Sequence, residues 1–113
     1  MVVMPIPRSL LPHSATKKPF IGQGDWGNEQ YGAEIQLKHV RFEPSSKLIA
    51  DKENKQRNLS AVMFFDCRNS LPKGASFSEE DKIAFGSLEF TVAAVYPHYT
   101  TGTTPHHYEI GLI

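Results

Sequence analysis

The residues of this 113-residue chain best suited to chemistry are three histidines, His98, His106 and His107. Imidazole nitrogens bind transition metals and exchange protons near neutral pH. Adjacent residues on a β-strand point to opposite faces, so His106 and His107 cannot share one ion unless the strand is broken there. Cys67 is the single cysteine, which excludes an internal disulfide and a cysteine-based zinc site. We therefore expect no metal site, and we interpret Cys67 as a small hydrophobic residue.

The sequence has no recognisable catalytic motif. It contains no G-x-S-x-G nucleophile elbow, and its cysteine and histidines stand in no setting typical of a nucleophile and its base. The run GQGDWG at residues 22–27 resembles a dinucleotide-binding fingerprint. That fingerprint requires a preceding strand and a following helix, whereas prolines precede this run. We expect residues 22–27 to form a loop, and we expect neither enzyme activity nor a cofactor.

Composition excludes several classes of partner. Twelve basic and twelve acidic residues balance, so no overall field attracts the chain to nucleic acid or to an anionic membrane. No stretch approaches the roughly 18–20 apolar residues that span a bilayer, and the N-terminal segment has prolines where a signal peptide has its apolar run. We expect no membrane partner and a protein made and kept in the cytoplasm. Electrostatic recognition, where it occurs, must be local.

Residues 81–113 predict a β-meander, because β-forming residues alternate with polar ones. A two-residue link at Gly86-Ser87 suits a type II′ turn, which requires a positive φ at its first residue. That link places Phe85 opposite Leu88 and Ile83 opposite Phe90, with all four side chains on one face. The same face is expected to continue through Val92, Ala94 and Tyr96, and the last strand adds Tyr108, Ile110 and Leu112.

Two further strands are predicted upstream of the meander. Ala33, Ile35 and Leu37 alternate with polar residues, and the apolar phase then shifts to Val40 and Phe42. A shift of this kind is typical of a β-bulge, which we expect near Lys38 and His39. The second strand begins at Leu59, with one apolar side formed by Leu59, Ala61, Met63 and Phe65 and the other by Val62 and Phe64. Together these patterns predict an all-β fold, a small barrel or sandwich of about five to six strands.

The N-terminal 32 residues combine four prolines with apolar side chains. This pattern suits neither a helix nor a central strand, yet it is too apolar for a solvated tail. We expect an extended arm over residues 1–32, beside a barrel domain over residues 33–113. The arm would bury its apolar side chains against its own barrel or against a neighbouring subunit. Its candidate contact residues are Leu10, Leu11, Phe20, Ile21 and Trp26.

A long connection, residues 43–58, joins the two upstream strands. It is much longer than a hairpin requires and is locally basic. One interpretation is a solvated, mobile loop, with one helical turn begun by Ser45 or Ser46. The other is a functional loop, as long loops retained in compact domains often are. Its candidate residues are the cations Lys47, Lys52, Lys55 and Arg57 and the apolar pair Leu48 and Ile49.

An oligonucleotide-binding barrel is the alternative to a structural role. Such barrels stack bases on aromatic side chains that stand among basic residues. The candidate aromatics are Tyr31, Phe42, Phe64, Tyr96, Tyr99 and Tyr108, and the basic residues near them are Lys38, Arg41 and Lys82. Few cations stand among many aromatics, so we favour ordinary core aromatics over base stacking.

Several blocks in order carry a resemblance over nearly the whole chain. They are PHSATKKPFIGQGDWGNEQYG, YGAEIQLKHVRFEPSS, DKENKQRNLSAVMFFDCRNSLPKG, EEDKIAFGSLEFTVAAVYP and HHYEIGLI. In these blocks the chain resembles the small minor capsid proteins of tailed phages and prophages of Gram-positive bacteria. The resemblance implies a head-completion protein in the virion neck, made in the host cytoplasm. Such proteins form a ring between the portal with its adaptor and the tail.

The resemblance also implies roles for the two segments singled out above. Related stopper proteins are small β-barrels whose long inter-strand loop projects into the central channel and holds packaged double-stranded DNA. By position, residues 43–58 would be that loop, and the arm would contact adjacent subunits or rings. The chain departs from a simple stopper in having no strongly apolar loop tip beyond Leu48 and Ile49. The plugging role is therefore less supported by the resemblance than the connector role.

Overall fold

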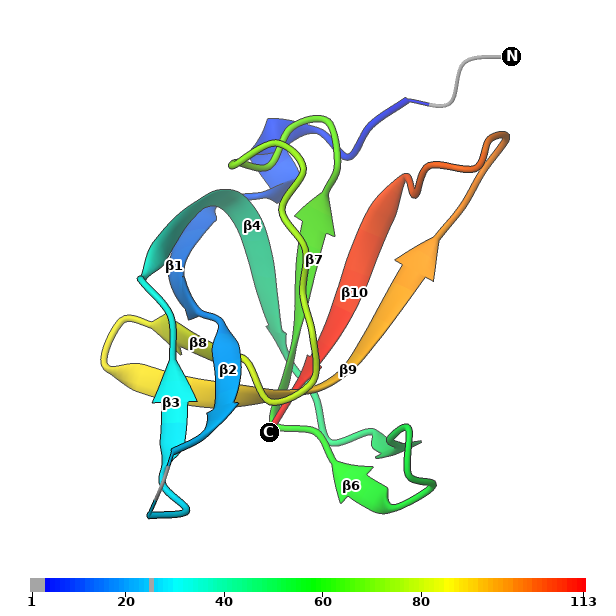
Figure 1. Ribbon diagram of the computed structural model, residues 1–113. Coiled ribbons are helices and arrows are strands. Elements are labelled where there is room, and N and C mark those ends of the chain that lie inside the picture. The colour runs from blue at the N-terminus through cyan, green and yellow to red at the C-terminus, as the bar shows by residue number, and fades with distance from the viewer. Residues whose placement is uncertain (1–3, 25) are drawn as a thin grey trace.

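The computed structural model describes residues 4–24 and 26–113. Residues 1–3 of the predicted arm and residue 25 of the predicted loop lie outside the described part. Six antiparallel strands close into a barrel, and two separate hairpins project from it (Figure 1). The prediction of a small all-β barrel is confirmed. Among the described residues, no helix combines the length and apolar character that crossing a membrane would need.

The barrel follows the order β1-β4-β7-β10-β9-β8, with every neighbouring pair antiparallel. A short 3-10 helix, Arg8–Leu10, precedes the first strand. The barrel strands are β1 (His13–Lys18), β4 (Ile35–Pro44), β7 (Ala61–Asp66), β8 (Lys82–Phe85), β9 (Leu88–His98) and β10 (His107–Leu112). The hairpins pair β2 (Phe20–Gln23) with β3 (Glu29–Tyr31), and β5 (Leu48–Ala50) with β6 (Gln56–Asn58).

Strand β1 corrects the expectation that the first 32 residues form an extended arm without a central strand. It lies between β4 and β8 and closes the barrel. The prolines at positions 12 and 19 flank this strand and do not interrupt it, so every ladder N–H within it remains available. Its inward side chains are Ala15 and Lys17, and the Lys17 ammonium donates to the Ser76 carbonyl and lies 5.0 Å from the centre of the Phe77 ring. The strand was not predicted because its composition is polar.

The predicted hairpin at Gly86-Ser87 is confirmed in type and register. Phe85 pairs with Leu88 and Ile83 pairs with Phe90. Gly86 has a φ of 61°, a conformation that costs glycine little and other residues more.

The predicted bulge in β4 is confirmed at His39. Ser14 of β1 pairs with Lys38, whereas His13 pairs with Val40, so His39 is an extra residue on this side of the ladder. His39 has a φ of 58°, and its carbonyl accepts a hydrogen bond from the Ser70 hydroxyl. The bulge lets β4 bend around the barrel in Figure 1.

A second bulge, in β9, was not predicted. Gly111 pairs with Ala94 but Leu112 pairs with Val92, which leaves Ala93 without a partner on β10. The apolar phase therefore changes after Val92. As a result Tyr96 is exposed, and the expectation that Ala94 and Tyr96 continue the inner face is wrong.

Two apolar clusters stabilise the molecule. The first fills the barrel and includes the predicted inward residues of β4, β7 and β10: Leu37, Val40, Ala61, Met63, Phe65, Ile110 and Leu112. The second cluster lies where the β5–β6 hairpin joins the barrel, and it consists of Ile49, Leu59, Ala93 and Ala94 with Val62 and Ile113 against them. Leu59 belongs to this second cluster, contrary to the expectation that it shares the face of Ala61 and Met63.

Candidate functional site

The predicted long loop folds into a hairpin, β5–β6. Leu48 pairs with Asn58 and Ala50 pairs with Gln56, so the helical turn considered for this segment does not form. At its tip, one carboxylate oxygen of Asp51 accepts hydrogen bonds from the backbone N–H groups of Glu53 and Lys55, both at 3.0 Å. An aspartate that binds the backbone in this way fixes a tight turn.

One of the four predicted loop cations is already paired within the hairpin. Arg57 lies 3.4 Å from the second carboxylate oxygen of Asp51. The backbone hydrogen bond from Lys55 and the guanidinium of Arg57 lower the pKa of Asp51, so its charge and the turn are retained at neutral pH. Lys47, Lys52 and Lys55 are exposed, and they remain as the outward cations of this hairpin.

The apolar pair of this loop separates into two roles. Leu48 is 54% exposed, whereas Ile49 is 7% exposed and packs in the second cluster. Gly111 of β10 makes this packing possible, because a Cβ built there would lie 2.9 Å from Leu59 Cδ2 and 3.7 Å from Ile49 Cδ1. Ile49 is therefore an anchor that attaches the hairpin to the barrel, and Leu48 is the outward residue.

The β2–β3 hairpin lies within the predicted N-terminal arm. Phe20 pairs with Tyr31, and their rings are 5.7 Å apart between centroids. The buried carboxylate of Asp81 attaches the hairpin to the barrel by accepting a 2.8 Å hydrogen bond from the Phe20 N–H. Its second oxygen accepts a 2.9 Å hydrogen bond from the Ser78 N–H, in the turn that precedes β8.

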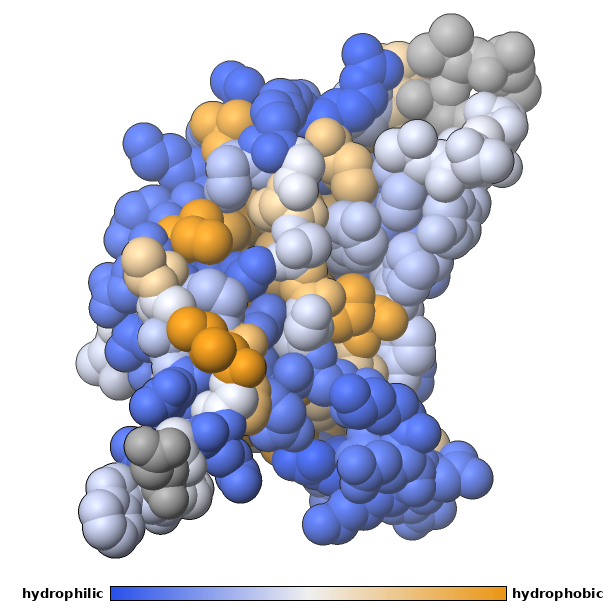
Figure 2. Space-filling model, in the orientation of Figure 1, coloured by the Kyte–Doolittle hydropathy of each residue, from blue (hydrophilic) through white to orange (hydrophobic). Residues whose placement is uncertain are grey.

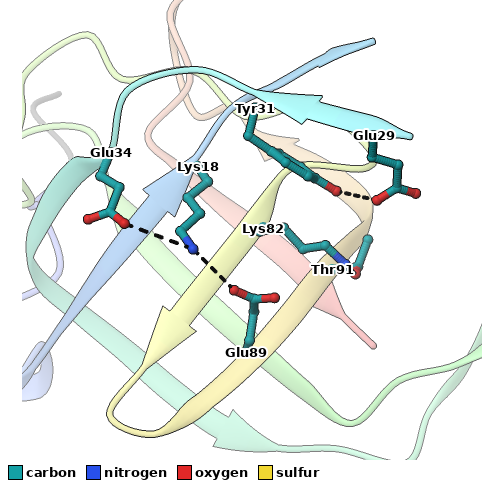
Figure 3. Close-up of polar contacts among 7 residues, drawn as sticks. All are labelled: Lys18, Glu29, Tyr31, Glu34, Lys82, Glu89 and Thr91. Carbon is teal, nitrogen blue, oxygen red and sulfur yellow. Dashed lines mark hydrogen bonds and ion pairs between the residues drawn. The ribbon is translucent and has the colours of Figure 1, made fainter. Parts of the chain in front are cut away.

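Polar contacts cover the barrel face beside this hairpin (Figure 3). The Lys18 ammonium lies between two carboxylates, 3.5 Å from Glu89 and 3.9 Å from Glu34. The Tyr31 hydroxyl donates a 2.5 Å hydrogen bond to Glu29, and this bond raises the pKa of Tyr31 to about 12. Tyr31 thus stays protonated at neutral pH.

The five predicted arm residues fall into two groups. Leu11 is buried in its own chain and Phe20 is half-buried against Tyr31. Leu10 is exposed, Ile21 is 68% exposed and Trp26 is 95% exposed. Some of the arm residues thus pack within their own chain, and others remain exposed for a neighbouring subunit. The exposed group is concentrated on the β2–β3 hairpin.

The three histidines meet at the opposite end of the barrel. His106 precedes β10, and its Nδ1 lies 2.9 Å from Nδ1 of His107 while its Nε2 lies 2.7 Å from the Met4 carbonyl. His98 stacks on His107 at 4.6 Å and approaches Glu109 at 3.2 Å. Burial and the two neighbouring imidazoles lower the pKa of His107. In the described part of the chain, no group of three or more potential ligands is placed to hold a metal ion.

The aromatic residues considered for base stacking do not form one platform with cations. Phe42 and Tyr108 pack against the core, while Tyr96 and Tyr99 are exposed. Two of the three nearby cations are engaged elsewhere, since Lys82 donates to the Thr91 hydroxyl and Arg41 pairs with Glu43 at 2.9 Å, and Lys38 is exposed. These contacts do not favour the oligonucleotide-binding alternative.

Asp66 and Asp81 are important residues that sequence reasoning did not select for these roles. Asp66 is fully buried, and its carboxylate accepts hydrogen bonds from the N–H groups of Ile6, Arg68 and Asn69 at 2.8–3.1 Å. It thereby fixes the start of the described arm to the end of β7. The available signal was an aspartate between an apolar strand and the turn cluster that follows it.

Comparison with known proteins identifies a family for this chain. A family model described as minor capsid protein matches residues 7–112. A comparison with curated proteins finds no match. The matched region includes every strand of the described residues, both hairpins and the histidine cluster. Since the match extends over nearly the whole chain, this protein belongs to the minor capsid protein family.

Proposed function

We propose that this minor capsid protein is a head-completion protein of a phage neck, where copies form a ring below the portal and its adaptor. A structural role in the virion follows from the family. The finer role would be mechanical: the ring retains packaged DNA and joins the tail. No catalytic step and no cofactor enter this role.

The β5–β6 hairpin is the observation that carries the proposal. It projects from one end of the barrel (Figure 1), and its projecting part is almost entirely hydrophilic in the same orientation (Figure 2). The buried Ile49 and the Asp51 turn hold it in one shape. A polar projection whose turn is held by hydrogen bonds of its own side chain and backbone is suited to line a channel.

Contact with DNA in such a channel would be loose and independent of sequence. Lys52 and Lys55 stand at the hairpin tip and are exposed. Lysines near phosphates supply a salt-dependent attraction that reads no base sequence. Repetition around a ring would multiply this weak attraction without fixing the DNA in register.

The outward apolar residues supply the proposed contacts with other proteins. Leu10, Ile21 and Trp26 are exposed on the segment before β4. The candidate partners are further copies of the chain, the portal with its adaptor, and tail proteins. Exposed apolar groups of this size are typical of interaction sites when they gather on one surface.

Deletion of the protein from its phage tests the proposal. We expect particles with filled or leaking heads and no attached tails, seen by electron microscopy, and infectivity restored by the protein supplied in trans. Normal tailed and infectious particles would contradict the proposal.

A narrower experiment tests DNA retention. Changing Lys52 and Lys55 together to Gln should leave the fold unchanged and increase DNA loss from heads during heating. The matched control changes Lys73, an exposed lysine in the turn after β7, to Gln. Equal DNA loss from both variants would exclude a specific role for the hairpin tip.

A further inference from the structure

We propose that the β2–β3 hairpin of one copy docks into the groove between β5 and the β9–β10 face of the next copy. The proposal rests on the ring assembly proposed above and names its subunit contact. The contact is heterologous: a projection on one side of the molecule meets a different surface on the other side.

The projecting surface is apolar at its tip. Trp26 is 95% exposed and Ile21 is 68% exposed. Tryptophan is enriched among the residues that contribute most to binding, and its burial removes a large apolar surface from water. The hairpin that carries it is fixed to the barrel by Asp81, so little flexibility is lost on docking.

The receiving surface is a groove of about 400 Å³. Leu48, 54% exposed, and Tyr96 are its outward apolar residues. An indole in this groove can stack on the Tyr96 ring and meet the ammonium of Lys47, two contacts that favour tryptophan over an aliphatic residue. The full lining is Lys47, Leu48, Ile49, Tyr96, His98 and Glu109.

Charge complementarity identifies the occupant as a second copy. Residues 20–34 contain three acidic residues and no lysine or arginine, whereas residues 45–58 contain four basic and two acidic residues. The acidic hairpin therefore matches the basic one across a contact, which steers association and suppresses other pairings. Glu29 on β3 is exposed and lies three residues after Trp26, and exposed Lys47 is adjacent to Leu48.

Charge also separates this groove from a second apolar hollow on the molecule. That hollow, about 350 Å³, opens beside Phe42, Phe85 and Leu88. Its described lining has no lysine or arginine, and its Glu43 is paired with Arg41, so it offers no cation to an acidic hairpin, whereas Lys47 lines the β5 groove. The β5 groove is the more suitable receiver.

The arrangement of the two surfaces agrees with a closed ring. In Figure 1 the β2–β3 and β5–β6 hairpins project from the same end of the barrel, on opposite sides. Repetition of one contact between unlike surfaces builds a ring when the rotation closes. One Trp and one Ile bury less than the roughly 1,000 Å² of a stable interface, so association in solution should be weak and concentration-dependent.

Trp26 itself reports the contact, because it is the single tryptophan of the chain. We expect its fluorescence emission to move to shorter wavelength as the protein concentration increases, in parallel with larger species in sedimentation. Trp26→Ala should weaken association by about 30-fold or more, the effect of a strong interface residue. No association and no emission shift up to about millimolar concentration would overturn the proposal.

A matched pair of leucines distinguishes the groove from general apolar adhesion. Leu48→Ser should weaken association, whereas Leu88→Ser should not. Leu88 is 58% exposed, close to the 54% of Leu48, and it lies at the β8–β9 turn away from the groove. Equal effects of the two substitutions would overturn the proposal.

Mixing two defective variants tests the head-to-tail geometry. Trp26→Ala retains its groove and Leu48→Ser retains its tryptophan, so one of each should combine into a dimer that grows no further. Failure to form this mixed dimer would overturn the proposed contact. If the purified protein associates but phage particles that lack it are tailed and infectious, the neck role alone is refuted. If the purified protein does not associate but particles that lack it have no tails, the contact alone is refuted.

Discussion

The two hairpins of this barrel differ in how they are attached and in what they present. The β5–β6 hairpin is attached by apolar packing of Ile49 and presents lysines. The β2–β3 hairpin is attached by the buried carboxylate of Asp81 and presents Trp26 and Ile21. Each attachment is thus the chemical opposite of the surface that it supports. A projection keeps its shape when its base uses a different interaction from its tip, because partners of the tip do not compete for the base.

The largest expected effect separates the buried anchor of β5–β6 from its outward neighbour. Ile49→Ala should reduce the free energy of unfolding by about 2–3 kcal/mol, because it empties part of the second cluster. Leu48→Ala should change it by less than about 0.5 kcal/mol, as exposed substitutions do. Urea unfolding measures both values. Similar losses for the two variants would contradict the division into a buried anchor and an outward residue.

Asp81, the polar anchor of β2–β3, should contribute somewhat less to the free energy of unfolding than Ile49. Asp81→Asn removes the negative charge and replaces one of the two oxygens that accept backbone hydrogen bonds. The free energy of unfolding should fall by about 1–2 kcal/mol. Glu34→Gln, which neutralises an exposed carboxylate near the same hairpin, is the control and should cost less than about 0.5 kcal/mol. Hydrogen exchange should increase at residues 20–31 in Asp81→Asn and remain unchanged at residues 48–58. Uniform loosening of both hairpins would refute separate anchoring.

A substitution that disturbs the close packing over Gly111 should have a smaller effect on the free energy of unfolding. Gly111→Ala places a Cβ against Leu59, and moving that side chain should cost about 1 kcal/mol. In a double-mutant cycle, Leu59→Ala should remove this penalty, because the clash disappears with the leucine side chain. Additive losses would show that the clash does not determine the effect of the substitution.

The smallest effect is a contrast in pH response between the two hairpins. The pKa of Asp51 is lowered, so its turn is stable above about pH 4, the unfolded value, and loses stability as pH falls below it. The pKa of Tyr31 is raised to about 12, so its bond to Glu29 is stable below about pH 10 and is lost as pH rises through 12. NMR titration of both residues measures this. Loosening of both hairpins in the same pH range would contradict it.

Patterns with a fixed period predicted much of the barrel. The Gly86-Ser87 register, the bulge at His39 and the inward faces of β7 and β10 follow from alternation and turn chemistry. Strand β1 was missed because its inward residues are alanine and a lysine whose ammonium finds a carbonyl partner. The Ala93 bulge was missed because Ala93 and Ala94 are both alanines, so the sequence does not show where the inward and outward positions change over. In these cases tertiary contacts decide what local composition leaves open.

Composition identified the candidate site, and packing divided it. The sequence singled out Leu48 with Ile49, and Leu11 with Trp26, as equivalent residues. The structure buries one member of each pair and exposes the other. Burial of Ile49 depends on Gly111, a residue more than sixty positions later in the chain. No local pattern contains that information, because the contact exists only after the barrel has closed.

A reconstruction of the intact virion neck would show the position of this protein and its subunit contacts together. We predict a closed ring of this barrel between the portal with its adaptor and the tail. In that ring the β2–β3 hairpin of each copy lies in the β5 groove of the next, and Lys52 and Lys55 face the channel. Density for the barrel at another site of the capsid, with none in the neck, would contradict the account.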